Sequence, residues 1–221
     1  MCGRFALFAD RYTVAAFVQA PEPTFDWDAR YNIAPTQSVI ACRLSDKSRE
    51  LVRFRWGLIP SWAKDPSAGV KAINARAETL TEKPLFRTVF QKRRCLIPAS
   101  GYFEWKTTGK KKQPFFIHQG ELIAFAGLWE TWAKGDEPIS SCTIITTAAD
   151  ETMRALHERM PVILPPASFA TWLDPLTAQP ELLNLLQPAH GLSVYPVGPQ
   201  VSNVRNQGPA LVAPIADPFQ A

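Results

Sequence analysis

The chain has 221 residues, of which 46% are hydrophobic, and its formal net charge is +4. This length and composition allow a full buried core and exclude a largely disordered chain, so we expect one domain over residues 1–221. The longest apolar run, Leu122 to Trp129, is far shorter than the roughly 18 residues of a membrane span. Asp10 and Arg11 interrupt the start of the chain before a signal-peptide core could form, which predicts a cytoplasmic protein.

The first half of the chain predicts one helix and two strands. Asp10 can cap a helix whose apolar residues share one face, namely Val14, Phe17 and Val18. Strands are predicted over Ser38 to Leu44 and over Leu51 to Trp56. The second strand alternates inward apolar residues (Val52, Phe54 and Trp56) with outward arginines (Arg53 and Arg55).

The second half of the chain is richer in strands. A helix is predicted over Leu85 to Gln91, with Pro84 near its first turn. Strand-like runs follow over Arg94–Ile97, Tyr102–Trp105, Pro114–His118, Glu121–Leu128 and Cys142–Thr146.

The last third of the chain returns to short helices. Asp150 can cap a helix that places three residues on one face: Met153, Leu156 and His157. Two short helices near Ala167–Leu173 and Glu181–Leu186 precede a last strand near Leu192–Val197. Because strands follow one another without regular crossover helices, we predict an α+β fold. It is a single domain with a largely antiparallel, partly barrel-like sheet and short flanking helices.

The cysteines and histidines are scattered along the chain. The four cysteines, Cys2, Cys42, Cys95 and Cys142, contain no C-x-x-C pair, which fits neither a zinc site nor a compact disulfide framework. We therefore expect reduced thiols and no metal or other cofactor.

Basic residues are concentrated in one segment. From Lys83 to Lys112 the chain has nine Lys or Arg residues and a single acid, Glu104, with aromatic residues interleaved. Such a run is commonly a solvated face. The aromatic residues make a groove for single-stranded nucleic acid an equal alternative, because bases stack on aromatic rings while cations follow the backbone.

The second residue of the chain is a cysteine. Removal of Met1 would leave Cys2 with a free α-amine, whose pKa of roughly 7.7 to 8.0 lies well below the value of about 10.4 for lysine. An aldehyde can then react twice, first with the amine as a Schiff base and then with the sulfur, which closes a five-membered thiazolidine. The alternative is that Cys2 simply packs in the core, as free cysteines often do.

Seven segments in fixed order point to one family. They are MCGRF (1–5), YNIAPTQ (31–37), RWGLIPSW (55–62), INARAET (73–79), RCLIPASGYFEW (94–105), HERMPV (157–162) and NVRNQG (203–208). Together they resemble the SOS response-associated peptidase (SRAP) family, whose members cross-link to abasic sites in single-stranded DNA. The resemblance covers nearly the whole chain.

The resemblance implies four catalytic residues. Cys2 matches the family's nucleophile, and Asn74, Glu104 and His157 match its asparagine, glutamate and histidine. An amide can hold the sugar or the amine, and a carboxyl with a raised pKa and a histidine can transfer protons. Each also has an ordinary alternative: a turn residue for Asn74, a surface pair with Lys106 for Glu104, and a half-buried packing residue for His157.

Five residues near these segments are candidates for DNA binding. Arg4, Arg76 and Arg159 stand close in sequence to the catalytic candidates and suit phosphate binding. Trp62 and Trp105 could stack on bases, although tryptophan more often lies in a core.

The predicted function is covalent capture of abasic sites in single-stranded DNA by a monomer that associates with the nucleoid. Schiff-base chemistry of this kind also makes a lyase side reaction possible. Two alternatives stay open: a thiol peptidase in which Cys2 cleaves after Met1 with His157 as base, and a non-covalent single-strand binder.

Overall fold

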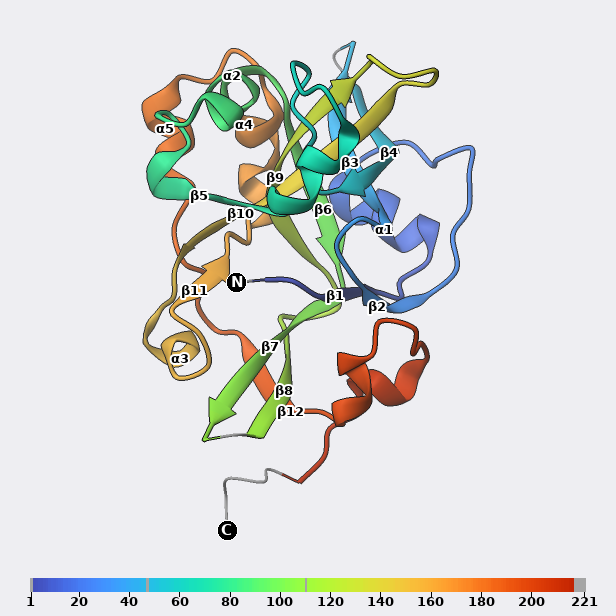
Figure 1. Cartoon of the computed structure of the whole chain (residues 1–221), viewed down its shortest axis with the longest axis vertical. Helices are drawn as coiled ribbons and strands as arrows, with labels where there is room; N and C mark the ends of the chain where they lie inside the picture. The colour runs from blue at the N-terminus through green and yellow to red at the C-terminus, as the bar shows by residue number, and fades with distance from the viewer. Residues whose placement is uncertain (1, 47, 110, 217–221) are drawn as a thin grey trace.

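Two β-sheets make up most of the computed structural model, which describes residues 2–46, 48–109 and 111–216 (Figure 1). The smaller sheet has the strand order β12-β8-β7-β1-β2. Its strands are β1 (Phe5–Leu7), β2 (Arg30–Ile33), β7 (Gly101–Thr108), β8 (Lys111–His118) and β12 (Ser193–Pro196). All of its pairings in the described residues are antiparallel.

The larger sheet closes on itself. Its strand order is β11-β10-β4-β3-β6-β9, and β9 also pairs with β10, so five of its strands form a ring. The strands are β3 (Ser38–Ser45), β4 (Ser48–Trp56), β6 (Arg94–Ala99), β9 (Ile123–Trp132) and β10 (Ile139–Ala148), with β5 (Asn74–Arg76) and β11 (Arg159–Pro161) added on β10. Only the pairings of β4 and β5 with β10 are parallel among the described strands. The predicted α+β class with a largely antiparallel sheet is confirmed.

Aromatic side chains fill the space where the two sheets meet. Phe5 of β1 packs edge-on against Trp56 of β4 and Phe125 of β9, with ring centroids 5.2 and 5.7 Å apart. Inside the ring, a Cβ on Gly127 would lie 2.9 Å from the Cys95 sulfur, so only glycine fits there. Burial of these large rings supplies much of the hydrophobic stabilisation, and it fixes β1 against the ring.

Short helices cover the outside of the sheets. The α-helices are α1 (Arg11–Val18), α2 (Pro84–Lys92), α3 (Glu151–Arg154), α4 (Phe169–Leu173) and α5 (Gln179–Asn184), and the 3-10 helices are η1 (Pro66–Lys71), η2 (Ala77–Thr79), η3 (Pro166–Ser168), η4 (Pro199–Ser202) and η5 (Pro209–Val212). Asp10 and Asp150 cap α1 and α3 as predicted, by accepting from the backbone N–H of Thr13 and Met153 at 2.9 and 2.8 Å. No helix in the described ranges is long and apolar enough to cross a membrane.

One prediction about the elements was wrong, and four short strands were missed. The helix after Asp150 ends at Arg154, so Leu156 and His157 lie in the following turn and do not share a helix face with Met153. The strands β1, β2, β5 and β11 were not predicted, because a run of three or four residues is too short for its pattern to stand out.

Candidate active site

The site is built around Cys2, which lies directly before β1. The strand β1 runs between β7 and β2, and the backbone N–H of Phe103 in β7 donates to the Arg4 carbonyl at 2.9 Å. Asn74, at the start of β5, donates from Nδ2 to the Cys2 carbonyl at 2.8 Å. Cys2 is fully buried. The segment that leads into the smaller sheet is thus held by a side chain from the larger sheet.

Glu104 supplies a buried carboxyl next to Cys2. It lies on β7 and is 4% exposed. Burial raises the pKa of Glu104, and the nearby His157 partly opposes this effect. Burial also raises the pKa of the Cys2 thiol, and the carboxylate of Glu104 raises it further. The site therefore favours a neutral thiol and a carboxyl that can hold a proton at a higher pH than usual.

His157 faces the same space from the turn between α3 and β11. Its Nδ1 accepts a hydrogen bond from the backbone N–H of Arg159 at 2.9 Å. A neutral imidazole with Nδ1 as acceptor carries its proton on Nε2, so Nε2 is the donor. His157 and Glu104 both line a cavity of about 400 Å³. The other residues that line it are Arg4, Trp105, Thr107, Lys112 and Ser202.

One polar atom of the Asn74 side chain makes no hydrogen bond within the described residues. Its Nδ2 is bonded to Cys2, but its buried Oδ1 has no hydrogen-bond partner among the residues that the structure describes. Buried polar atoms are nearly always paired, so an orphaned acceptor beside Cys2 is suited to a donor that arrives with a ligand. Of the four predicted catalytic residues, Asn74 is joined directly to Cys2, while Glu104 and His157 meet at the cavity.

Arg4 forms one wall of the cavity through a network that sequence reasoning missed. Its Nη1 donates to Asn32 Oδ1 and to the Val201 carbonyl, both at 2.7 Å, and its guanidinium lies 5.7 Å from the Trp105 ring centroid. Asn32 is fully buried, and its Nδ2 lies 2.9 to 3.2 Å from three carbonyl oxygens, those of Val201, Asn203 and Asn206. One amide thus connects Arg4 with residues 201–206.

The two other predicted phosphate-binding arginines differ in their surroundings. Arg76 is exposed at the end of β5. Arg159 instead makes a bidentate ion pair with Glu78, at 2.6 and 2.9 Å, and donates to the Thr146 carbonyl at 2.7 Å. This hydrogen bonding with Arg159 lowers the pKa of Glu78. A phosphate at Arg159 would therefore compete with a carboxylate that is hydrogen-bonded to it, whereas Arg76 acts on Glu78 only through its charge and more weakly.

The two predicted stacking tryptophans also separate. Trp62 is 64% exposed and lies outside the cavity that Glu104 and His157 line. Trp105 is half-buried in the wall of that cavity, and its Nε1 donates to Ser202 Oγ at 3.2 Å. Trp62 is therefore the one whose ring is available without rearrangement.

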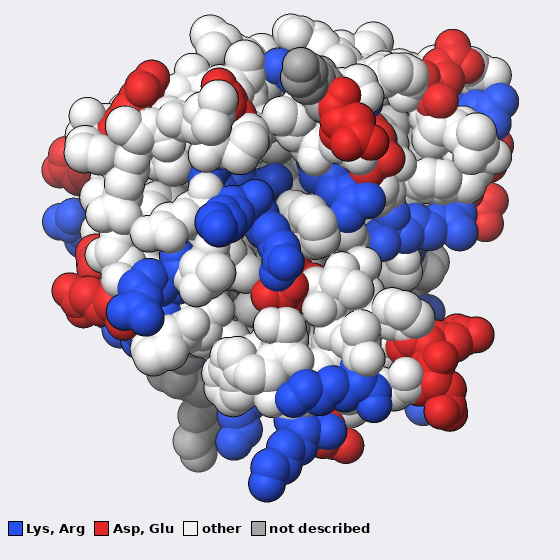
Figure 2. Space-filling view, turned by 90° about the horizontal axis from the view of Figure 1, so that it is seen from above, with Lys and Arg blue, Asp and Glu red and all other residues white. Residues whose placement is uncertain are grey.

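The basic segment from Lys83 to Lys112 does not form one groove. Its α2 part lies at the opposite end of the molecule from the β7–β8 hairpin (Figure 1). Four of its aromatic residues are buried in the core, namely Phe86, Phe90, Tyr102 and Phe103. Figure 2 shows Lys and Arg side chains near the centre of one face, with acidic side chains among and around them. An aromatic stacking groove along this segment is therefore not supported.

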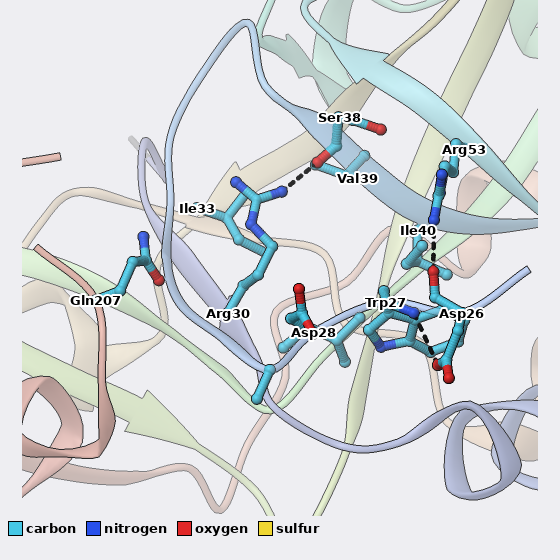
Figure 3. Close-up of a pocket in the computed structure, with 12 residues that line it drawn as sticks. Asp26, Trp27, Asp28, Arg30, Ile33, Ser38, Val39, Ile40, Arg53 and Gln207 are labelled. Atoms are coloured by element: carbon cyan, nitrogen blue, oxygen red, sulfur yellow. Dashed lines mark hydrogen bonds between the residues drawn. The ribbon is translucent and has the colours of Figure 1, made fainter. Parts of the chain in front are cut away.

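A second cavity, of about 520 Å³, lies away from these residues (Figure 3). Its wall includes Trp27, Arg30 and Arg53, but all nine predicted site residues lie elsewhere. Both arginines are used by the fold, since Arg30 and Arg53 donate to backbone carbonyls of Ser38 and Asp26. The larger volume here does not identify the candidate site, because Glu104 and His157 do not line this cavity.

Comparisons with a family model and with individual proteins give matches that agree with one another. The family model described as SOS response associated peptidase (SRAP) matches residues 1–204. Abasic site processing protein YoqW of Bacillus subtilis is 41% identical over 225 residues, which cover 96% of this chain and 99% of YoqW. Abasic site processing protein YedK of Escherichia coli is 34% identical over 231 residues, which cover 97% of this chain and 100% of YedK.

A solved structure has a closely similar fold. The crystal structure of a protein from Bacteroides thetaiotaomicron superposes with a TM-score of 0.87 at 27% sequence identity. The match covers 97% of this chain and 100% of that protein.

Proposed function

The chain belongs to the SOS response-associated peptidase (SRAP) family, and from this we propose that it processes abasic sites in DNA by capturing them covalently. In this proposal Met1 is removed, and the α-amine and thiol of Cys2 together form a thiazolidine with the ring-opened sugar. The mature protein acts on single-stranded DNA as a monomer. Its relatives YoqW and YedK are named abasic site processing proteins.

The observation that supports this most is the position of Cys2 between an amide and a buried carboxyl. Asn74 donates to the Cys2 carbonyl at 2.8 Å, and the buried carboxyl of Glu104 is close enough to raise the pKa of the Cys2 thiol. An amine released at Cys2 would therefore be oriented on one side and have a proton-transfer group on the other. Such positioning is a large part of catalysis.

The chemistry of capture follows in two steps. The amine adds to the aldehyde carbon, and the carbonyl oxygen takes two protons and leaves as water, which gives the Schiff base. The sulfur then attacks the same carbon, its proton passes to a base, and the electron pair of the C=N bond returns to nitrogen, which takes up a proton. Glu104 is suited to both transfers because its raised pKa lets it donate a proton and then accept one.

Ring closure also explains why capture protects the strand. A Schiff base acidifies the neighbouring carbon and favours β-elimination of the 3′ phosphate, which breaks the strand. The thiazolidine has no C=N bond and removes this pathway. Strand cleavage of the lyase type is then a side reaction that ring closure suppresses.

The surroundings of Cys2 favour capture over a thiol peptidase. A peptidase needs a thiolate, and cysteine nucleophiles normally have a lowered pKa. Here burial raises the pKa of the Cys2 thiol. In thiazolidine formation the amine reacts first, so no thiolate is required at the start.

A denaturing gel separates covalent capture from the two alternative functions. Mature protein, with loss of Met1 confirmed by intact mass, is incubated with matched single-stranded oligonucleotides that contain or lack one abasic site. We expect a heat-stable shifted band with the abasic strand only. A non-covalent binder would give no shifted band, and a peptidase would give none with either strand. Absence of a stable band with verified mature protein would reject the proposal.

A further inference from the structure

Tyr102 carries a polar group that the fold does not use. Its side chain is fully buried, and its hydroxyl has no hydrogen-bond partner among residues 2–46, 48–109 and 111–216. The hydroxyl of Tyr195, in contrast, donates to the Val212 carbonyl at 3.0 Å. An unpaired buried hydroxyl destabilises a fold, so a phenylalanine would be the better residue for packing alone.

The strand register places Tyr102 beside the reactive residues. It precedes Glu104 by two positions on β7, so both side chains lie on the same face of that strand. Tyr102 also pairs with Phe5 of β1, three residues after Cys2. On the other face of β7, Phe103 and Trp105 belong to a separate apolar cluster. The orphaned hydroxyl therefore lies on the Cys2 side of the sheet.

The electrostatics of this position keep the hydroxyl protonated. Burial raises the pKa of Tyr102 well above its usual value, and negative charge on Cys2 or Glu104 would raise it further. The phenol is therefore a hydrogen-bond donor at any working pH and not a base. Its effect on the reaction must be to stabilise negative charge rather than to accept a proton.

We propose that the Tyr102 hydroxyl donates a hydrogen bond to the sugar C1 oxygen while the Cys2 amine adds to the aldehyde. This inference rests on the proposed capture function. In the addition step the nitrogen lone pair forms the N–C bond, the C=O π pair moves to oxygen, and a proton passes from nitrogen to that oxygen through Glu104. Tyr102 transfers no proton, and it stabilises the oxygen while its charge develops.

The variant Tyr102→Phe tests this with three independent readouts. The ring and its edge-on contact with Phe125, at a centroid distance of 6.0 Å, are kept. We expect the rate of borohydride-trapped adduct at saturating abasic DNA to fall on the order of 10²-fold, as for loss of one donor to a developing oxyanion. The dissociation constant for intact single-stranded DNA should not change. The melting temperature should stay the same or rise, because the lost hydroxyl had no partner.

Tyr195→Phe is the matched control. It removes a hydroxyl that is bonded within the fold, so it should lower the melting temperature and leave the capture rate unchanged.

The outcomes separate this inference from the proposed function. Slow capture by Tyr102→Phe with unchanged affinity and melting temperature supports it. If the Tyr102→Phe variant captures abasic DNA at the wild-type rate, the inference is wrong. It is also wrong if Tyr102→Phe lowers the melting temperature as Tyr195→Phe does, because the hydroxyl would then stabilise the fold. Failure of the wild-type protein to capture abasic DNA would instead reject the capture function itself.

Discussion

Two groups of side chains differ in their exposure to solvent. The inner group, Cys2, Tyr102 and Glu104, is at most 4% exposed, and burial raises the pKa of all three. The outer group is formed by exposed residues such as Trp62 and Arg76. Burial of polar atoms away from water lowers the stability of the fold, but it strengthens their electrostatic interactions with reacting atoms. The comparison predicts that changes in the inner group alter chemistry and stability, while changes in the outer group alter affinity alone.

Blocking the amine of Cys2 should have the largest effect. A protein that keeps Met1, or carries any residue before Cys2, has an amide nitrogen without an available lone pair. We expect complete loss of covalent capture on a denaturing gel, with single-strand affinity by fluorescence anisotropy unchanged. Intact mass confirms the terminus of each preparation. A blocked protein that captures abasic DNA at a comparable rate would move the nucleophile to an internal thiol or lysine.

Cys2→Ser should remove the second step only. The amine remains and can still form a Schiff base, but no sulfur closes the ring. We expect loss of the heat-stable adduct and recovery of a cross-link when borohydride is added. Wild-type protein under the same treatment is the control, since its adduct does not depend on borohydride. A heat-stable adduct of the serine variant would contradict the thiazolidine.

Glu104→Gln should slow capture and yet stabilise the fold at neutral pH. We expect a rate about 10² to 10⁴-fold lower, the usual effect of losing a general acid–base group. The raised pKa of Glu104 means that the unfolded chain loses this proton at a lower pH than the folded chain. Ionisation therefore favours the unfolded state. Each pH unit between the two values corresponds to about 1.4 kcal/mol.

The pH dependence of unfolding checks this sign. Relative to Glu104→Gln, the free energy of unfolding of the wild type should fall as pH rises above the usual carboxyl value of 4.5, and the two proteins should converge below it. Chemical denaturation at a series of pH values measures the difference. A wild type that is more stable than the variant at neutral pH would mean that the carboxylate is stabilised in the fold.

Substitutions of Arg76 in the outer group and of the partly buried Arg159 should have the smallest effects on capture. Arg76→Ala should weaken single-strand binding several-fold and reduce the slope of log K against log salt by about 0.7, with the melting temperature unchanged. Arg159→Ala should flatten the slope and also lower the melting temperature, because the pair with Glu78 and the bond to Thr146 are lost. The exposed Arg87 of α2 is the control: Arg87→Ala should keep the wild-type slope.

The fold could be predicted from the sequence where an element is long enough to show a pattern. Strands β3 and β4 contain the two predicted strands Ser38–Leu44 and Leu51–Trp56, and Asp10 and Asp150 cap helices as expected. The short strands β1, β2, β5 and β11 could not be predicted, because three or four residues carry no period. Several of the recognised sequence segments lie on these strands, which tertiary contacts hold in place.

The site could be predicted only through the order of the recognised segments. These identified Asn74 and Glu104, but no local signal marks the pair between Arg159 and Glu78, which are 81 positions apart. The orphaned hydroxyl of Tyr102 was also beyond prediction. An aromatic residue in a strand predicts core packing, and whether its hydroxyl finds a partner depends on the complete fold.

The hydrogen bonds of the Asn32 side-chain amide affect which parts of the fold can open together. It binds the carbonyls of Val201, Asn203 and Asn206 from within β2, and Gln207 donates back to the Asn32 carbonyl at 3.0 Å. Residues 201–207 are therefore attached to β2 rather than free to fray alone. In hydrogen exchange, amides of β1 and β2 should become exposed together with this segment as one cooperative unit. Local opening of the last part of the fold would then release Arg4 as well, so that the cavity wall and the final turns of the chain have a common stability.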